Sequence, residues 1–256
     1  MNRSPFFLLA QTPHDAASFL LAQKGSGKFV LTLNTELLAR SLSDPDFAKA
    51  VQSTPYRVCD SVGAKWILQR HLANSSIFRI PGVDLGKAVL SLCARQALPV
   101  FLLGGKEGVA FKAKEMLTSE YPKLRVVGCA NGYFTPCELP ALRGKIHRSG
   151  ARVVLVCLGS PYQEKWIIEN RSACPDVELF LPLGGSMDVY AGELPRAPLC
   201  WRKMGMEWLY RLLTAPNKKV RVCRLASAVW CALTTGQEIG DFLKQSIKCN
   251  QMNNRV

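Results

Sequence analysis

The stretch ARVVLVCLGSPYQEKWIIENR, residues 151–171, decides the fold of this 256-residue chain. Residues 151–159 form an apolar run that ends in glycine, as expected for a strand that is buried on both faces. Residues 161–171 have the composition of a helix, with Pro161 near the first turn, where proline is tolerated. A buried strand that passes through a glycine turn into a helix is typical of a parallel βαβ unit.

The rhythm of strand, glycine-containing turn and helix repeats along the chain from residue 97 onward. Short apolar segments that fit strands lie at residues 29–33, 56–60, 99–105, 124–134, 151–159 and 177–185. Helical patterns follow Asn34 and cover residues 82–96, 107–122 and 161–171. This alternation predicts an α/β fold with a Rossmann-like, mostly parallel sheet, whose ligands lie outside the carboxyl ends of the strands.

We expect three parts along the chain. Residues 1–96 form a smaller N-terminal α/β part, and residues 97–198 form the Rossmann-like part. Residues 199–256 form a basic, helical C-terminal appendage. Neither an internal repeat nor a low-complexity tract is visible in the sequence.

The chain is strongly basic, with a net charge of +14 from 33 basic and 19 acidic residues. Between Arg196 and Arg224 there are eight Lys or Arg residues and one acidic residue, Glu207. This excess indicates a polyanionic partner: a phosphorylated substrate, an anionic membrane surface or nucleic acid. Nucleic acid is disfavoured, because the sequence contains no helix-turn-helix, zinc-finger or RNP pattern.

Ten cysteines are scattered along the chain, without a CxxC pair or the Cys/His spacing of a zinc site. We interpret them as small apolar residues of a protein in the reducing cytosol, and we expect no metal site. The apolar run PFFLLA near the N-terminus is too short for a signal peptide, and no stretch approaches ~20 apolar residues. We therefore expect a cytoplasmic protein with peripheral contact to the inner face of the cell membrane.

Three glycine-containing turns follow expected strands: LGGKEG, LGSPYQE and LGGSMD. Each turn precedes a helix, whose amino-terminal N–H groups favour anions. Turns of this kind can simply cap helices. The turns LGSPYQE and LGGSMD, together with the sequence ELPRAP that follows the second of them, indicate a cradle for a diphosphate.

Three other motifs have competing interpretations. GSGK at residues 25–28 lacks the spacing of a phosphate-binding P-loop, so we interpret it as a loop. Asp44 and Asp46 resemble a metal-binding DxD, but they follow a helix and fit a turn with an N-cap better. Asp60 ends an apolar segment and is either a general base or the N-cap of a helix that begins near Ala64.

A basic segment near the C-terminus precedes the apolar sequence LASAVWCAL. It contains Lys218, Lys219, Arg221 and Arg224. This pattern fits a helix that lies in a membrane interface, where basic side chains contact anionic headgroups. It fits equally well the solvated face of a helix that is docked on the protein body.

Nine motifs occur together in the order and spacing of one known family. They are TLNTE (32–36), CDSVG (59–63), RIPGVDL (79–85), FLLGGKEGVA (101–110), NGYF (131–134), LGSPYQE (158–164), GGSMDVYAG (184–192), RAP (196–198) and EWLYRLL (207–213). Over roughly residues 29–222 the chain therefore resembles the WecG/TagA/CpsF family of bacterial sugar transferases, glycosyltransferase family 26.

The resemblance implies an inverting transferase that uses neither a metal ion nor another cofactor. It would move a sugar from a UDP-sugar to a saccharide on undecaprenyl diphosphate, in surface polysaccharide or exopolysaccharide synthesis. The resemblance also implies Asp60 as the catalytic base, beside Thr32 and Asn34. By resemblance, Arg79 and Gln163 line the donor site. The other residues that we predict to bind the substrate are Gly104, Gly132, Tyr133, Gly159, Gly184, Gly185, Asp188 and Arg196. The implied acceptor and membrane contacts are Arg211, Lys218, Lys219, Arg221 and Arg224.

The sequence departs from the family pattern at Thr35, Ser61, Tyr162, Met187 and residues 217–219. These departures leave the donor sugar open, and the acceptor glycan and the oligomeric state, including a homo-oligomer, are open as well. A non-catalytic module that binds a UDP-sugar or a lipid is the alternative, although such a module needs no base. A Rossmann-type oxidoreductase is disfavoured, because the chain lacks GxGxxG and the acidic residue that follows it.

Overall fold

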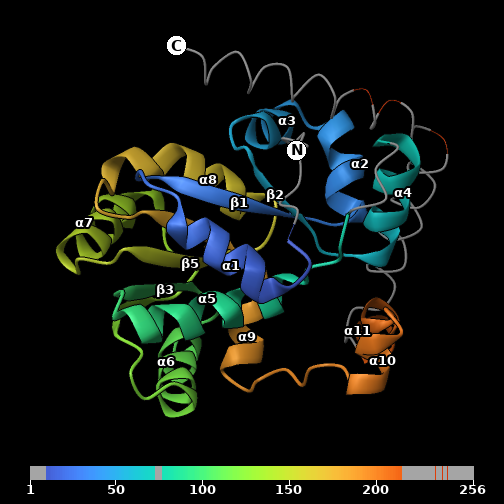
Figure 1. Cartoon of the computed structure of the whole chain (residues 1–256). Helices are drawn as coiled ribbons and strands as arrows, with labels where there is room; N and C mark the ends of the chain where they lie inside the picture. The colour runs from blue at the N-terminus through green and yellow to red at the C-terminus, as the bar shows by residue number, and fades with distance from the viewer. Residues whose placement is uncertain (1–9, 73–76, 215–233, 235–237, 239–240, 242–256) are drawn as a thin grey trace. The chain divides into compact units, whose positions relative to one another are not determined.

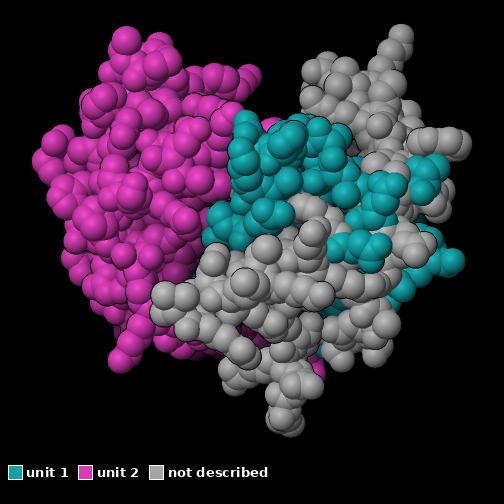
Figure 2. Space-filling view, turned by 90° about the horizontal axis from the view of Figure 1, so that it is seen from above, with its two compact units in different colours: residues 1–9, 33–79, 195–256 teal, residues 10–32, 80–194 magenta. Residues whose placement is uncertain are grey.

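The computed structural model describes residues 10–72, 77–214, 234, 238 and 241. The chain forms two compact units, each assembled from segments that are separated in the sequence (Figure 2). Unit 1 comprises residues 33–79 and 195–256 together with the N-terminal nine residues, and unit 2 comprises residues 10–32 and 80–194. The three-part division expected along the sequence remains a prediction.

Six strands form one sheet in the order β2-β1-β6-β5-β3-β4 (Figure 1). The strands are β1 (Lys28–Leu33), β2 (Tyr56–Cys59), β3 (Val100–Gly104), β4 (Val126–Ala130), β5 (Val153–Cys157) and β6 (Leu179–Pro182). The pairings of β1 with β6, β6 with β5, β5 with β3, and β3 with β4 are all parallel. The predicted α/β fold with a Rossmann-like parallel sheet is therefore confirmed.

The centre of the sheet is apolar because its strands are buried on both faces. Every residue of β3, β5 and β6 is buried, as their unbroken runs of Val, Leu and Phe predict. The register aligns Val153 of β5 with Val100 of β3 on one side and with Leu179 of β6 on the other. In a parallel sheet this alignment brings the carboxyl ends of these strands to one edge.

The helices of unit 2 are α1 (Pro13–Ala22), α5 (Gly82–Gln96), α6 (Val109–Glu120), α7 (Leu139–Arg148), α8 (Tyr162–Asn170) and α9 (Ser186–Tyr190). Short 3-10 turns cover Pro136–Glu138 and Arg171–Ala173. Helix α5 has the bounds that its sequence pattern predicts. The sequence analysis did not assign α1 and α7. A capping box of Thr12 and Asp15 begins α1, and one of Thr135 and Glu138 precedes α7, so this local signal was present.

Unit 1 contains β2 and the helices α2 (Thr35–Ser43), α3 (Pro45–Gln52), α4 (Val62–Leu72), α10 (Leu199–Lys203) and α11 (Glu207–Thr214). Helices α4 and α10–α11 are neighbours, because a Cβ on Gly205 would lie 2.5 Å from a methyl group of Val62. Within the described residues, no helix is both long and apolar enough to cross a membrane.

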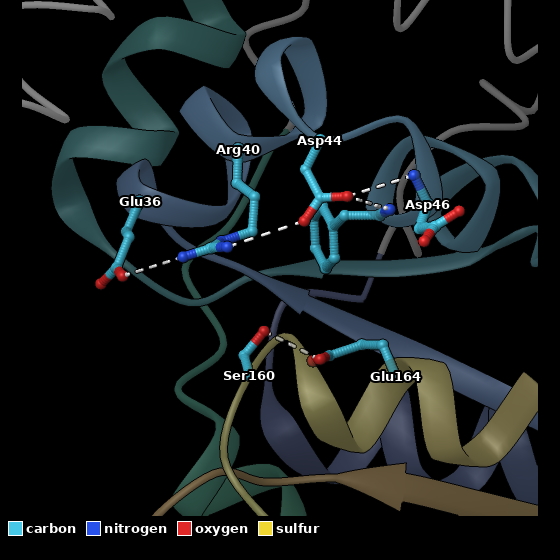
Figure 3. Close-up of polar contacts among 7 residues, drawn as sticks. Glu36, Arg40, Asp44, Asp46, Ser160 and Glu164 are labelled. Carbon is cyan, nitrogen blue, oxygen red and sulfur yellow. Dashed lines mark hydrogen bonds and ion pairs between the residues drawn. The ribbon is translucent and has the colours of Figure 1, made fainter.

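Two of the competing interpretations are settled by local geometry. The Asp44 carboxylate accepts the N–H groups of Asp46 and Phe47, each at 3.1 Å, and lies 3.7 Å from Arg40 (Figure 3). It is therefore the N-cap of α3, as the turn interpretation predicts. Residues 25–27 form a loop with positive φ angles at two glycines, and Lys28 begins β1, so the loop interpretation is also confirmed.

Candidate functional site

A cavity of about 450 Å³ lies in unit 2 where four parallel strands end. Its walls come from the segments that follow β3, β4, β5 and β6. The lining residues are Gly105, Lys106, Gly132, Tyr133, Cys157, Leu158, Gly159, Tyr162, Gly184, Gly185 and Asp188. This is the edge at which open parallel sheets bind ligands.

Six predicted donor-site residues line this cavity together: Gly132, Tyr133, Gly159, Gly184, Gly185 and Asp188. At Gly159 and Gly184 a Cβ would meet no atom within 4 Å, and both residues have a positive φ. Bare backbone therefore faces open space at these two strand ends. Exposed peptide groups of this kind can approach a ligand closely, because no side chain intervenes.

Gly104 contributes to the cavity in another way. It is not a lining residue, and a Cβ built on it would lie 2.3 Å from the carbonyl oxygen of Cys157. A Cβ on Gly132 would in turn lie 3.2 Å from the Gly104 Cα. These glycines let the ends of β3 and β5 and the segment after β4 pack closely together, which shapes one wall of the cavity.

Gln163 is 2% exposed and lies behind the cavity wall. Its Oε1 accepts the Gly184 N–H at 2.8 Å, and its Nε2 donates to Glu164 Oε1 at 2.8 Å. Ser160 Oγ donates to the other oxygen of Glu164, also at 2.8 Å (Figure 3). Gln163, which the family resemblance implies as a donor-site residue, therefore binds the loop after β6 that lines the cavity.

Several lining residues were not predicted from the sequence. Among them, Lys106 contributes a charge and Tyr162 an aromatic ring. Lys106 adds a positive charge to the lining, and the Gly-Gly-Lys sequence that ends β3 carried this signal. Tyr133 is 76% exposed, and the rings of Tyr162 and Phe134 lie 6.4 Å apart. The lining therefore combines a cation, the carboxylate of Asp188 and aromatic faces.

A second group of predicted residues gathers in unit 1 at the ends of two strands. The Asp60 N–H donates to the carbonyl oxygen of Leu33 at 2.8 Å, which joins the ends of β1 and β2. Asn34 follows directly and caps α2, with its Oδ1 accepting the Leu37 N–H at 2.9 Å. The motifs TLNTE and CDSVG therefore meet at this point.

Ser61, and not Asp60, is the N-cap of α4. Its Oγ accepts the Ala64 N–H at 3.1 Å and lies 3.3 Å from Thr35 Oγ1. The interpretation of Asp60 as the cap of this helix is therefore wrong. The Ser61 hydroxyl thus satisfies one N–H group of the helix N-terminus.

Arg79 lies beside the same strand end, because it pairs with Cys59 in a parallel bridge. Its guanidinium donates to the Arg202 carbonyl oxygen at 3.0 Å. Burial and the nearby Asp60 charge raise the pKa of the Cys59 thiol to about 12. We refer to the group formed by Asn34, Thr35, Asp60, Ser61 and Arg79 as the Asp60 cluster.

The remaining predicted residues are members of neither group, or they lie outside the described residues. Thr32 belongs to unit 2, where its hydroxyl donates to the Pro182 carbonyl oxygen at 3.4 Å. In unit 1, Arg196 Nε lies 3.7 Å from Glu207 Oε1 in a mostly buried ion pair. Arg211 lies in α11. The basic residues Lys218, Lys219, Arg221 and Arg224 lie outside the described residues.

Among the described residues, no group of three His, Cys, Asp or Glu side chains could hold a metal ion. The cysteines have mixed environments. Cys59, Cys93, Cys157 and Cys174 are buried, Cys129 is half-buried, and Cys137 and Cys200 are exposed. The interpretation as buried apolar residues is therefore confirmed for four of them and wrong for the two exposed ones.

A parallel sheet with a glycine-lined cavity at its carboxyl edge defines the class of Rossmann-like ligand-binding proteins. Within this class, the model of the glycosyl transferase WecG/TagA/CpsF family matches residues 8–238. The match covers most of the chain, so the chain belongs to this family. Its activity is sugar transfer in cell-surface polysaccharide synthesis, with a nucleotide-sugar donor and a saccharide acceptor.

Proposed function

We propose that the chain is an inverting, metal-independent glycosyltransferase that moves a sugar from a UDP-sugar to a saccharide on undecaprenyl diphosphate. The observation that carries the proposal is the cavity at four strand ends, with bare glycine backbone at Gly159 and Gly184. An arrangement of this kind suits a diphosphate, because peptide N–H groups can bind its oxygens without steric hindrance.

Unit 2 is assigned to the donor. The diphosphate would lie against the glycine segments after β5 and β6, and the Lys106 ammonium would offset part of its charge. Asp188 could accept hydrogen bonds from donor hydroxyl or N–H groups. The exposed ring of Tyr133 offers a face for a base or a sugar.

Unit 1 is assigned to proton transfer. Asp60 would take the proton of an acceptor hydroxyl while that oxygen forms a bond to the anomeric carbon. The bond from this carbon to the UDP oxygen breaks on the opposite face, which inverts the configuration. One carboxylate suffices for such a single displacement. The leaving diphosphate needs positive charge, for which Arg79, Arg196 and Arg211 are the proposed sources.

A donor screen tests the reaction. UDP-glucose, UDP-N-acetylmannosamine and UDP-N-acetylmannosaminuronate are each offered with a polyprenyl-diphosphate-linked saccharide, and UDP release is measured together with the anomeric configuration of the product. We expect turnover with one donor and inversion at its anomeric carbon. UDP binding without turnover of any donor would favour the non-catalytic alternative, and a retained configuration would contradict the single displacement.

Chelation tests metal independence. Activity is measured with excess EDTA and again after addition of magnesium or manganese. We expect full activity in EDTA, because Asp44 already caps α3 and pairs with Arg40. Loss of activity that either metal ion restores would show that the diphosphate needs a cation, and would overturn this part of the proposal.

Membrane contact is assigned to the basic segment of the C-terminal appendage. Each basic residue near an anionic leaflet contributes about 1 kcal/mol, so Lys218, Lys219, Arg221 and Arg224 together could decide membrane residence. We expect that replacing all four with Gln abolishes binding to vesicles of anionic lipid and keeps the fold. Binding of the unaltered chain should weaken steeply with salt. Equal vesicle binding by both proteins would place the contact elsewhere.

A further inference from the structure

We propose that Glu164 is a positioning residue of the donor cavity, which acts through the Gln163 amide on the loop that follows β6. The proposal rests on the proposed function in one respect, namely that the cavity binds the donor. We refer to Ser160, Gln163, Glu164 and Gly184 as the Glu164 network.

The Glu164 network joins two segments that line the cavity. Ser160, Gln163 and Glu164 come from the segment after β5, and Gly184 comes from the segment after β6. Three hydrogen bonds of 2.8 Å connect these residues in a row, from the Ser160 hydroxyl to the Gly184 N–H. Gly159 and Gly184, one from each segment, present bare backbone to the cavity.

The order of donors and acceptors gives Glu164 its role. The Gly184 N–H needs an acceptor, and only the oxygen end of the Gln163 amide can provide one. An amide can also be turned by 180°, which would bring its NH₂ group against this N–H. A carboxylate oxygen at the other end accepts from NH₂ and cannot donate in return, so Glu164 selects the orientation that binds Gly184.

Burial strengthens the preference of the Gln163 amide for this one orientation. Gln163 is 2% exposed and Glu164 is 1% exposed, so water does not replace a lost partner. A buried polar group that loses its partner is much more costly than a surface group. Glu164 does not line the cavity, so we infer that it acts on the ligand indirectly, through Gln163 and the Gly184 loop.

Two substitutions at position 164 separate this role from simple packing. Glu164→Met keeps a similar volume and removes both acceptors, so the Gln163 amide is free to turn. Glu164→Gln keeps one oxygen for Gln163 and places its NH₂ group against Ser160, whose hydroxyl can accept as well as donate. We therefore expect Glu164→Met to impair the cavity and Glu164→Gln to retain it.

Two measurements report on the cavity. Exchange of the Gly184 amide hydrogen, followed by NMR in the ligand-free protein, should accelerate about tenfold or more in Glu164→Met and stay near the original rate in Glu164→Gln. The donor KM should rise about tenfold in Glu164→Met with a much smaller change in kcat. The exchange measurement needs no donor, so it remains decisive even if the proposed function fails.

A double substitution tests whether Glu164 acts through Gln163. Gln163→Leu removes the acceptor of the Gly184 N–H and should itself raise the donor KM. If Glu164 acts only through this amide, adding Glu164→Met should raise the KM no further. Additive increases in KM would instead mean an independent effect of Glu164 and would overturn the proposal.

Asn170→Leu is the matched control, because Asn170 is 1% exposed and donates to the Trp166 carbonyl oxygen at the far end of the same helix. It should lower stability and leave the donor KM unchanged. Should Glu164→Met fail to fold, Ser160→Ala removes a single donor and should accelerate Gly184 exchange severalfold. Unchanged exchange in every folded variant of Ser160 and Glu164 would overturn the proposal. If the unaltered protein does not bind the donor, the proposed function would be overturned instead.

Discussion

The cavity of unit 2 combines bare backbone at two strand ends with a few side chains, whereas the Asp60 cluster of unit 1 consists of side chains. In the cavity, Gly159 and Gly184 leave peptide groups uncovered, and Gly104 allows two segments to pack closely. In the cluster, Asp60 and Arg79 carry the charges, and hydroxyl and amide groups cap the surrounding helices.

Under the proposed function, this difference corresponds to two tasks of a transferase, donor binding and proton transfer. Peptide groups hold a ligand in place, but they do not titrate near neutral pH and so cannot accept a proton in the reaction. Ionisable side chains can do so, although each needs neighbours that keep it in position. Substitutions in unit 2 should therefore change mainly donor binding or stability, and substitutions of Asp60 should change mainly turnover.

The largest expected effect is that of Asp60→Asn, which tests the side-chain half of the comparison. The substitution keeps the shape of the side chain and removes its ability to take a proton. We expect kcat to fall by roughly 10²–10⁴-fold with little change in the binding of UDP-sugar, measured by steady-state kinetics and calorimetry.

Asp44→Asn is the control for this substitution. Asp44 also lies in unit 1, and asparagine caps a helix as well as aspartate does. Its kcat should stay within about twofold of the original, since a surface cap touches no reacting group. Near-normal turnover in Asp60→Asn would rule out Asp60 as the base.

The next largest effect is expected for Gly104→Ala, which tests the backbone half. The new Cβ would lie 2.3 Å from the Cys157 carbonyl oxygen, and the residue has a φ of 136°. Strain and overpacking together should lower the free energy of unfolding by more than about 3 kcal/mol, measured by denaturant titration. Gly108→Ala, where nothing lies within 4 Å, should cost only about 1 kcal/mol. Equal losses would show that close packing at Gly104 is unimportant.

A smaller effect is expected for Lys106→Met, which removes the positive charge from the cavity lining. The donor KM should rise roughly tenfold, as expected for the loss of one charge-assisted hydrogen bond, and kcat should change little. Lys112→Met is the control, because Lys112 lies on α6, pairs with Glu193 and does not line the cavity. A fall in kcat at constant KM would contradict the assignment of unit 2 to donor binding.

The smallest effect concerns buried thiols in both regions. Burial raises the pKa of Cys59 in unit 1 and of Cys157 in unit 2 from 9.0 to about 12. Above pH 9 the unfolded chain loses these protons while the folded chain keeps them, so stability falls as pH rises from about 9 to 12. Each thiol should contribute a loss of about 1 kcal/mol at pH 10.

Replacing each thiol separately with alanine checks this contribution. The unfolding free energy of each variant is measured from pH 8 to about pH 10 and compared with that of the unaltered chain. Each substitution should reduce the fall in unfolding free energy with pH by the contribution of one thiol. The exposed Cys137 and Cys200 serve as controls, because their replacement should leave the pH dependence unchanged. An unaltered slope in both buried variants would contradict the raised pKa values.

The sequence by itself determined the parallel α/β fold. The apolar runs at residues 99–105 and 151–159 predicted buried strands, and the periodicity of residues 82–96 predicted the bounds of α5. The glycine turns after β5 and β6 were correctly placed at the carboxyl ends of the strands, where they line the cavity. These features can be predicted from the sequence because each depends on the chemistry of residues that are neighbours along the chain.

Only the tertiary structure decided where each polar side chain lies and which partner it contacts. In the structure, Ser61 caps α4, and Lys106 and Tyr162 line the cavity. Gln163 is buried behind the cavity wall, and its side chain binds the Gly184 loop of that wall. A local pattern shows that a polar group is present near a strand end. Which partner that group meets depends on segments that only folding brings together, such as those of Glu164 and Gly184.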